Sequence, residues 1–210
     1  MMPMKRRAFH DECHHVVIEP SILYFGTPVV LLTTENSDGT FNLAPMSSAW
    51  ALGQVVVLGL GTSGQTLLNL RSRPDVVINL PGPELWTSVE KLAPLTGRSE
   101  VPESKRPAFR SEREKFKVAN LHHEPSLLVR PPRVAECIIQ LEARVRDIRL
   151  DSQSNFCIVQ AVVLKVHASS DIVVSGTNHV DPAAWSPLIY NFRHYFGLGE
   201  ELGRSFRSET

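Results

Sequence analysis

The segment between residues 59 and 66 has the composition of a phosphate-binding turn. Its glycines spell GxGxxG within GLGTSG, and Thr62, Ser63 and Thr66 add hydroxyl groups. At a strand end that leads into a helix, backbone N–H groups and the helix dipole can hold a phosphate. A dinucleotide cradle would need a longer crossover helix, an acidic residue closing the next strand and further βαβ units. That strand instead ends in Leu-Pro-Gly and the rest is β-rich, so we expect a monophosphate site, with a plain tight turn as the alternative.

Other candidate groups do not assemble into a catalytic or metal centre. The run HDECHH at residues 10–15 has no second cluster to fix a geometry, so we expect a solvated lead-in and no metal site. Cys137 and Cys157 do not lie at turns and no GxSxG occurs, so both are expected to fill the core. Ser47 and Ser48 have no base nearby in sequence and suit ligand binding better than nucleophilic attack. We therefore predict no catalytic side chain.

Composition restricts the class of protein. The 210 residues contain 22 Lys plus Arg and 22 Asp plus Glu, and 42% of them are hydrophobic. A net charge of zero gives no long-range field for nucleic acid or an anionic membrane, so neither is an expected partner. Three cysteines without a CxxC pair, no secretory leader and no membrane-length apolar run predict a cytoplasmic protein.

The pattern of residues predicts a β-rich single domain over residues 1–210. Strands are expected over 28–34, 55–61 and 75–80, a short helix over 66–73, and a long hairpin over 134–150 and 156–169. Pro45 and two serines interrupt the segment 41–52, which predicts a bulge or an edge with free backbone donors. Residues 1–20 are expected to be a lead-in and 84–114 an excursion over the surface. Because strand does not alternate with helix, an antiparallel barrel is favoured over a doubly wound parallel sheet.

Four segments, in this order and spacing, resemble one known family. They are PVVLLTTENSDGTFNLAPMSSAWAL, VVVLGLGTSGQTLLNLRSRPDVVINLP, VRPPRVAECIIQLEARV and DPAAWSPLIYNFRHYFGLGEELG. Together they are similar to the flavin reductase-like, FMN-binding split-barrel family, which includes flavoredoxins. The resemblance implies an all-β (β-rich α+β) fold, a six-stranded antiparallel split barrel with a few peripheral helices. It also implies a homodimer with FMN near the interface.

The resemblance also implies which residues bind the cofactor. Along the flavin ring it places the strand residues Asn42, Ala44, Pro45, Met46, Ser47 and Ser48. Around the ribityl phosphate it places Thr62, Ser63, Gln65, Thr66 and Asn69, the turn found above on independent grounds. Asn79 is expected to reach the flavin edge, and Tyr195 with Phe196 to pack near the flavin.

Two functions follow from the resemblance. In the first, an NAD(P)H-dependent flavin reductase transfers hydride from nicotinamide to FMN, and the protein contributes binding, geometry and exclusion of water without a side-chain acid or base. In the second, a non-enzymatic FMN-binding electron carrier is reduced by a partner protein. Space for a nicotinamide ring above the flavin would favour the first function over the second. A related barrel for pyridoxine phosphate or haem is less favoured, because a basic phosphate clamp and an axial ligand are not evident.

Overall fold

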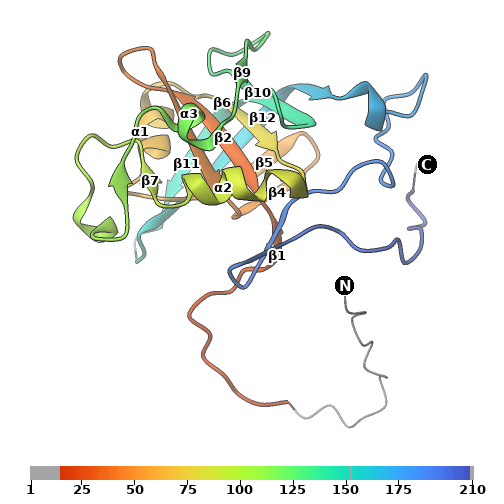
Figure 1. Cartoon of the computed structure of the whole chain (residues 1–210), viewed down its shortest axis with the longest axis horizontal. Helices are drawn as coiled ribbons and strands as arrows, with labels where there is room; N and C mark the ends of the chain where they lie inside the picture. The colour runs from red at the N-terminus through yellow and green to blue at the C-terminus, as the bar shows by residue number, and fades with distance from the viewer. Residues whose placement is uncertain (1–14, 152, 209–210) are drawn as a thin grey trace.

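The structure is a computed structural model that describes residues 15–151 and 153–208 (Figure 1). Its centre is a seven-stranded antiparallel sheet. The strands are β2 (Val30–Glu35), β3 (Phe41–Met46), β4 (Ala49–Leu52), β5 (Val55–Gly61), β6 (Asp75–Leu80), β11 (Ile139–Leu150) and β12 (Phe156–Ala168). Their order in space is β3-β2-β6-β11-β12-β5-β4. The predicted β-rich antiparallel fold is confirmed.

Smaller elements surround this sheet. Paired short strands are β1 (Phe25–Pro28) with β13 (Ile189–Asn191) and β14 (His194–Phe196), β7 (Leu95–Thr96) with β8 (Arg110–Ser111), and β9 (His123–Glu124) with β10 (Arg133–Val134). The helices are α1 (Gln65–Ser72), α2 (Trp86–Leu92) and α3 (Lys115–Ala119), with 3₁₀ turns at Pro83–Leu85, Glu103–Lys105 and Ser170–Ile172. Within the described part of the chain, no helix is both long and apolar enough to cross a membrane.

The barrel is split between β3 and β4. These strands follow each other along the chain, yet β3 pairs with β2 and β4 pairs with β5, at opposite ends of the sheet order. Only Ser47 and Ser48 separate them, so the segment predicted as one interrupted strand forms two strands. The sheet therefore has seven strands, whereas six were expected. Gly59 allows β5 to approach the break closely, because a Cβ there would lie 3.0 Å from the Cβ of Ser48.

The core of the barrel follows the alternation of its strands. Val56, Leu58 and Leu60 of β5 point inward beside Cys157 and Val159 of β12, in the register that pairs Leu58 with Val159. Both long strands of the predicted hairpin are present. Cys157 and Cys137 are buried free thiols, as predicted. Burial raises the pKa of the Cys137 thiol, which keeps it protonated and unreactive.

A second apolar cluster corrects the first part of the prediction that residues 84–114 run over the surface, whereas none of residues 97–114 is buried. Val89 and Leu92 of α2 are buried with Leu31 and Leu43, and Leu95 joins them. The physical reason is the three-residue spacing of Val89 and Leu92, which places both on one helix face that packs on the sheet. Figure 1 shows α2 lying in front of β2 and β4.

The chain ends behave differently from the barrel. Of the predicted lead-in, residues 15–20 are exposed coil, and the metal-ligand run at 10–15 lies outside the described residues except for His15. The aromatic tail packs as expected: Tyr190 of β13 contacts the ring of Tyr24 (centroids 5.4 Å apart) and that of Tyr195 (5.3 Å).

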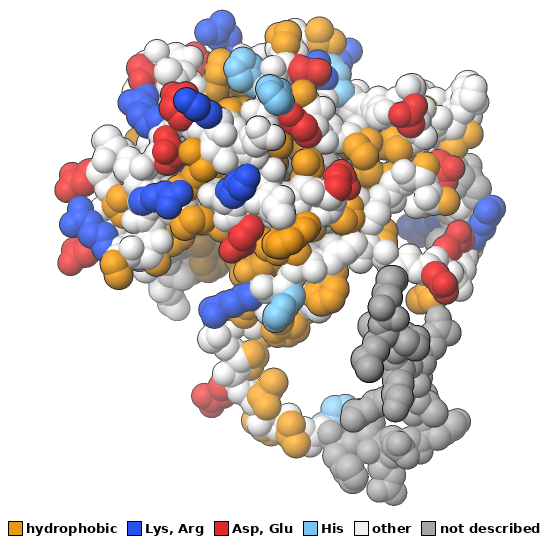
Figure 2. Space-filling model, in the orientation of Figure 1, with side chains coloured by type: hydrophobic (Ala, Val, Ile, Leu, Met, Phe, Trp, Pro, Cys, Tyr) orange, Lys and Arg blue, Asp and Glu red, His pale blue; other side chains and the backbone are white. Residues whose placement is uncertain are grey.

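In the orientation of Figure 1, Figure 2 shows hydrophobic side chains gathered between α2 and β1, and basic and acidic side chains mixed elsewhere on this face.

Candidate functional site

A cavity of about 470 Å³ lies between the β3–β4 break, the turn after β5, α2 and the aromatic tail. We call it the first cavity. It collects several of the sequence-predicted residues from distant parts of the chain. They are Ala44, Pro45, Met46, Ser47, Ser48, Thr66 and Tyr195. Of the described residues that line it, none is a carboxylate, a histidine or a cysteine.

The β3–β4 break provides hydrogen-bond donors to this cavity. The backbone N–H groups of Ser47 and Ser48 have no backbone acceptor among the described residues, because the ladder with β2 ends at Met46. The Ser48 hydroxyl donates to the hydroxyl of Tyr24 (3.4 Å), whereas that of Ser47 has no such partner within the described chain. The free donors predicted from the interruption at Pro45 are therefore present.

The turn after β5 and the start of α1 form the other end of the first cavity. Gly61, Gly64 and Thr66 line it, and α1 begins after Gly64 without a side-chain cap. The uncapped N–H groups and the helix dipole make this end attractive to an anion. Thr62 is turned toward Asn155, whose carbonyl accepts from its backbone N–H (3.0 Å). Thr62 and Ser63 therefore belong to the turn but do not line the cavity.

A buried polar network supports Thr66 from behind. Asn42 donates from Nδ2 to the Thr66 hydroxyl (3.2 Å), and Gln65 donates to Oδ1 of Asn69 (2.8 Å). Asn69 in turn donates to Thr34 (3.0 Å). Asn42, Gln65 and Asn69 therefore lie behind the cavity wall rather than in it. The Oδ1 atom of Asn42 is buried without a hydrogen-bond partner among the described residues, an uncommon state for a polar atom.

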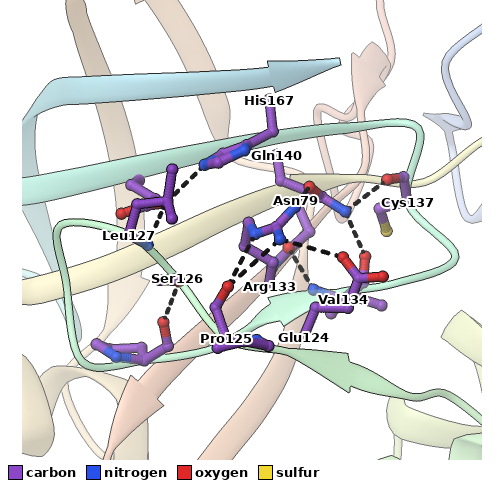
Figure 3. Close-up of polar contacts among 12 residues, drawn as sticks. Asn79, Glu124, Pro125, Ser126, Leu127, Arg133, Val134, Cys137, Gln140 and His167 are labelled. Carbon is purple, nitrogen blue, oxygen red and sulfur yellow. Dashed lines mark hydrogen bonds and ion pairs between the residues drawn. The ribbon is translucent and has the colours of Figure 1, made fainter. Parts of the chain in front are cut away.

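Asn79 is placed elsewhere. Its side chain is fully buried between strands, where Nδ2 donates to the carbonyl of Leu31 (2.9 Å) and Oδ1 accepts from the backbone of Val134 (2.8 Å). Figure 3 shows Asn79 beside Val134 and Gln140, in a cluster that fastens the β9–β10 hairpin to the sheet. The structure thus gives Asn79 an architectural position outside the first cavity.

Tyr195 reaches the first cavity from β14, and Phe196 does not. The Tyr195 hydroxyl donates to Glu90 of α2 (3.0 Å). Burial and the neighbouring Glu90 carboxylate raise the pKa of Tyr195, so the phenol stays protonated. Tyr195, Glu90 and Phe196 also line a second cavity of about 580 Å³ together with Trp86, Arg193 and His194. The two cavities thus share Tyr195 as a common wall.

Two lysines that the sequence did not single out add positive charge, which corrects the expectation that basic residues for binding a phosphate are missing. Lys105 lines the first cavity, and Lys115 is only 3% exposed with no hydrogen-bond or ion-pair partner among the described residues. Burial and the nearby charge of Lys105 lower the pKa of Lys115 to about 8, although Glu112 opposes the shift. The only sequence signal is that Lys115 precedes buried Ala119 by one helical turn.

Comparison with known proteins decides the family. A model described as the flavin reductase like domain matches residues 22–199. The chain belongs to the flavin reductase-like family. The uncharacterized protein YdfE of Bacillus subtilis (strain 168) is 49% identical over 195 residues, which cover 92% of this chain and 94% of YdfE.

Solved structures show the same fold. Flavoredoxin of Desulfovibrio vulgaris (Miyazaki F) superposes with a TM-score of 0.76 at 17% identity, over 94% of this chain and 100% of that one. Flavoredoxin from Methanosarcina acetivorans gives a TM-score of 0.75 at 15% identity, over 93% and 97% of the two chains. The split-barrel fold expected from the resemblance is confirmed, and membership of the family supports a redox function that involves a flavin.

The residues of the first cavity fit a phosphorylated flavin. Its volume lies within the usual range of about 300–1,000 Å³ for small-molecule sites. Met46, Leu60 and Leu67 offer an apolar wall to a ring system, and the Ser47–Ser48 break offers donors. At the other end, Lys105 and the uncapped start of α1 suit an anion, and the unpaired ammonium group of Lys115 adds charge nearby.

Proposed function

We propose that this protein is an NAD(P)H-dependent flavin reductase that binds FMN in the first cavity. One observation carries the proposal: a single cavity joins a donor-rich strand break to an anion-attracting helix start with lysine charge close by. A bound flavin would supply the redox chemistry, accepting a hydride from reduced nicotinamide.

The residues of the chain then have separable roles. Gly64 and Thr66 bind the phosphate, with Lys115 contributing charge from α3. Ser47 and the free N–H groups of the β3–β4 break donate to the polar edge of the ring, where preorganised donors stabilise developing negative charge. No carboxylate, histidine or cysteine lines the cavity among the described residues, so we expect these donors rather than a side-chain acid or base to assist reduction.

The second cavity supports the reductase over the electron carrier. It adjoins the first across Tyr195, and it holds Trp86 and Arg193, an exposed aromatic ring and a cation that suit a dinucleotide. A carrier reduced by a partner protein has no need of such a cavity. Phe192 and Arg193 form the hairpin turn before β14, both at positive φ, and this turn places Arg193 in the lining of the second cavity.

We also propose that the protein is a homodimer. Trp50 and Leu52 of β4 are 58% and 75% exposed. Phe156 and Ile158 of β12, on the far side of β5, are exposed on the same face of the sheet. A contiguous exposed apolar surface of this kind marks an interaction site. The exposure of these four side chains leaves the outer face available to a second copy.

Anaerobic titration tests the proposed activity. The FMN-loaded protein is titrated separately with NADH and NADPH, and the flavin absorbance is followed. Bleaching by at least one nicotinamide at a catalytically useful rate is expected. A bound flavin that dithionite reduces, but that neither nicotinamide reduces, would contradict the reductase and support the carrier.

A further inference from the structure

We propose that residues 102–109 form a clamp over the phosphate of the bound flavin, and that Lys105 makes the site select FMN over riboflavin. The inference rests on the proposed function, because it requires the flavin to occupy the first cavity. It adds a specificity-determining residue and assigns a role to the segment that the sequence analysis left as an excursion.

The geometry of the segment places Lys105 at the same cavity as the turn between β5 and α1, where the phosphate is proposed to bind. A 3₁₀ turn at Glu103–Lys105 is closed by the Lys105 N–H donating to the carbonyl of Pro102 (2.9 Å), and Phe109 N–H donates to the Lys105 carbonyl (3.0 Å). The Lys105 ammonium group lies 5.1 Å from the ring centroid of Phe109, and both side chains line the first cavity. The Ser104 hydroxyl reaches that of Ser63 in the turn (3.5 Å). The segment therefore bridges the cavity end where α1 begins.

Positive charge acts on both lysines near this end. Burial and the charge of Arg98 lower the pKa of Lys105, and the charge of Lys105 acts on Lys115 in the same direction. Among the described residues, neither lysine has an ion-pair partner, and Glu112 is the one carboxylate that offsets the charge of Lys115. Cations held together and partly desolvated repel one another, so an anion placed between them is stabilised by both.

A phosphate monoester is the anion that suits this arrangement. Its second ionisation has a pKa of about 6, so FMN carries close to two negative charges at neutral pH, whereas riboflavin carries none. The rest of the flavin is the same in both ligands. The ratio of the affinities for FMN and riboflavin therefore reports the contribution of the phosphate end of the cavity, because the contribution of the ring end is common to both ligands.

Binding measurements with matched variants test the clamp. Dissociation constants for FMN and riboflavin are measured by fluorescence quenching at pH 7.5 for the wild type, Lys105→Met and Lys117→Met. Lys117 is exposed on α3 outside the first cavity, so its loss removes the same charge from the same region without touching the site. We expect Lys105→Met to weaken FMN binding roughly tenfold to a hundredfold. Riboflavin binding should change less than twofold, and Lys117→Met should preserve the wild-type ratio.

Each outcome has a definite meaning. An unchanged FMN-to-riboflavin ratio in Lys105→Met would overturn the clamp, and so would an equal loss in Lys117→Met, which would indicate bulk charge. Equal affinity of the wild type for both ligands would overturn the clamp while leaving the flavin site standing. A wild type that binds neither ligand would overturn the proposed function itself, and the clamp with it. Preserved riboflavin binding also shows that the variant is folded.

Discussion

At the scale of single residues, Lys115 is a buried side chain without an ion-pair partner among the described residues, and its charge interacts with that of Lys105. A cation removed from water without a partner destabilises the folded state, which is why burial lowers its pKa to about 8. Buried groups with shifted pKa values cluster at functional sites, and under the proposed function this cation would add positive charge near the phosphate of the flavin. In that case the flavin-free protein is less stable than it would be without the buried cation.

Lys115→Met should make the flavin-free protein more stable and the flavin site weaker. A lysine pKa lowered from 10.5 to about 8 corresponds to a gain of about 1–3 kcal/mol in the free energy of unfolding at pH 7. FMN affinity should fall by roughly severalfold, because a positive charge near the cavity is removed. Urea unfolding and flavin titration measure the two effects. Lys117→Met serves as the exposed control and should change neither; a destabilised Lys115→Met would contradict the argument.

The same variant gives a pH dependence of defined sign. Between about pH 8 and 10.5 the unfolded chain keeps a proton on Lys115 that the folded protein has lost. The free energy of unfolding of the wild type therefore rises with pH through this window. We expect the stability advantage of Lys115→Met to shrink from pH 8 to pH 10.5. An advantage that is constant across this range would show that the gain has another origin.

At the scale of elements, the segment around β7 packs against the buried polar network that contains Asn42 and Gln65. Gly97 lies so close to β3 and α1 that a Cβ on it would meet Oδ1 of Asn42 at 2.4 Å and Cγ of Gln65 at 3.1 Å. The glycine therefore allows the chain after α2 to cross over these two elements. From there the chain continues to Lys105, so this crossing controls where the proposed clamp lies.

Gly97→Ala tests the crossing. The added methyl group must displace either the segment or Asn42, and we expect a loss of about 1–3 kcal/mol in the free energy of unfolding. FMN binding should weaken as well, because Asn42 holds Thr66. Thermal unfolding and flavin titration are the measurements. Gly199→Ala, where no heavy atom lies within 4 Å of an added Cβ, is the control. Equal behaviour of the two variants would contradict the close approach.

At the scale of the whole molecule, the barrel leaves an apolar outer face on β4, β5 and β12. Trp50 and Leu52 point to one side of β4 because they are two residues apart on a strand. A stable dimer buries about 1,200–2,000 Å² in total, which is the area that the proposed self-association through this face has to reach.

The dimer prediction is checked by light scattering at micromolar concentration. The wild type should give twice the 23.4 kDa mass of the chain. The double variant Trp50→Glu, Leu52→Glu should give the monomer mass, because charges on the apolar face would be desolvated in the interface. Leu202→Glu, at a 92% exposed position in the tail, should leave the mass unchanged. A monomeric wild type with flavin bound would refute the dimer.

The sequence by itself determined the elements whose signals are local. The β5 strand, its turn and α1 follow from apolar alternation, glycines and hydroxyl residues close together in the chain, and the hairpin of β11 and β12 follows from two β-type runs around one turn. An irregularity in this segment was also readable from Pro45, which cannot donate to a ladder; Pro45 itself lies in the edge strand β3, and the break follows at Ser47 and Ser48. The resemblance to a family extended these local signals to a fold and a list of candidate residues.

Only the tertiary structure decided which side chains meet in the first cavity. Lys105 and Lys115 lie in a polar stretch whose composition is typical of a solvated surface, and no local pattern distinguishes a lysine that packs inward from one that does not. Asn79 shows the reverse case, an amide on a strand whose partners, Leu31 and Val134, come from elsewhere in the chain. Burial and charge proximity arise from contacts between residues far apart in sequence. These contacts are set when α2 and the following segment pack against the barrel.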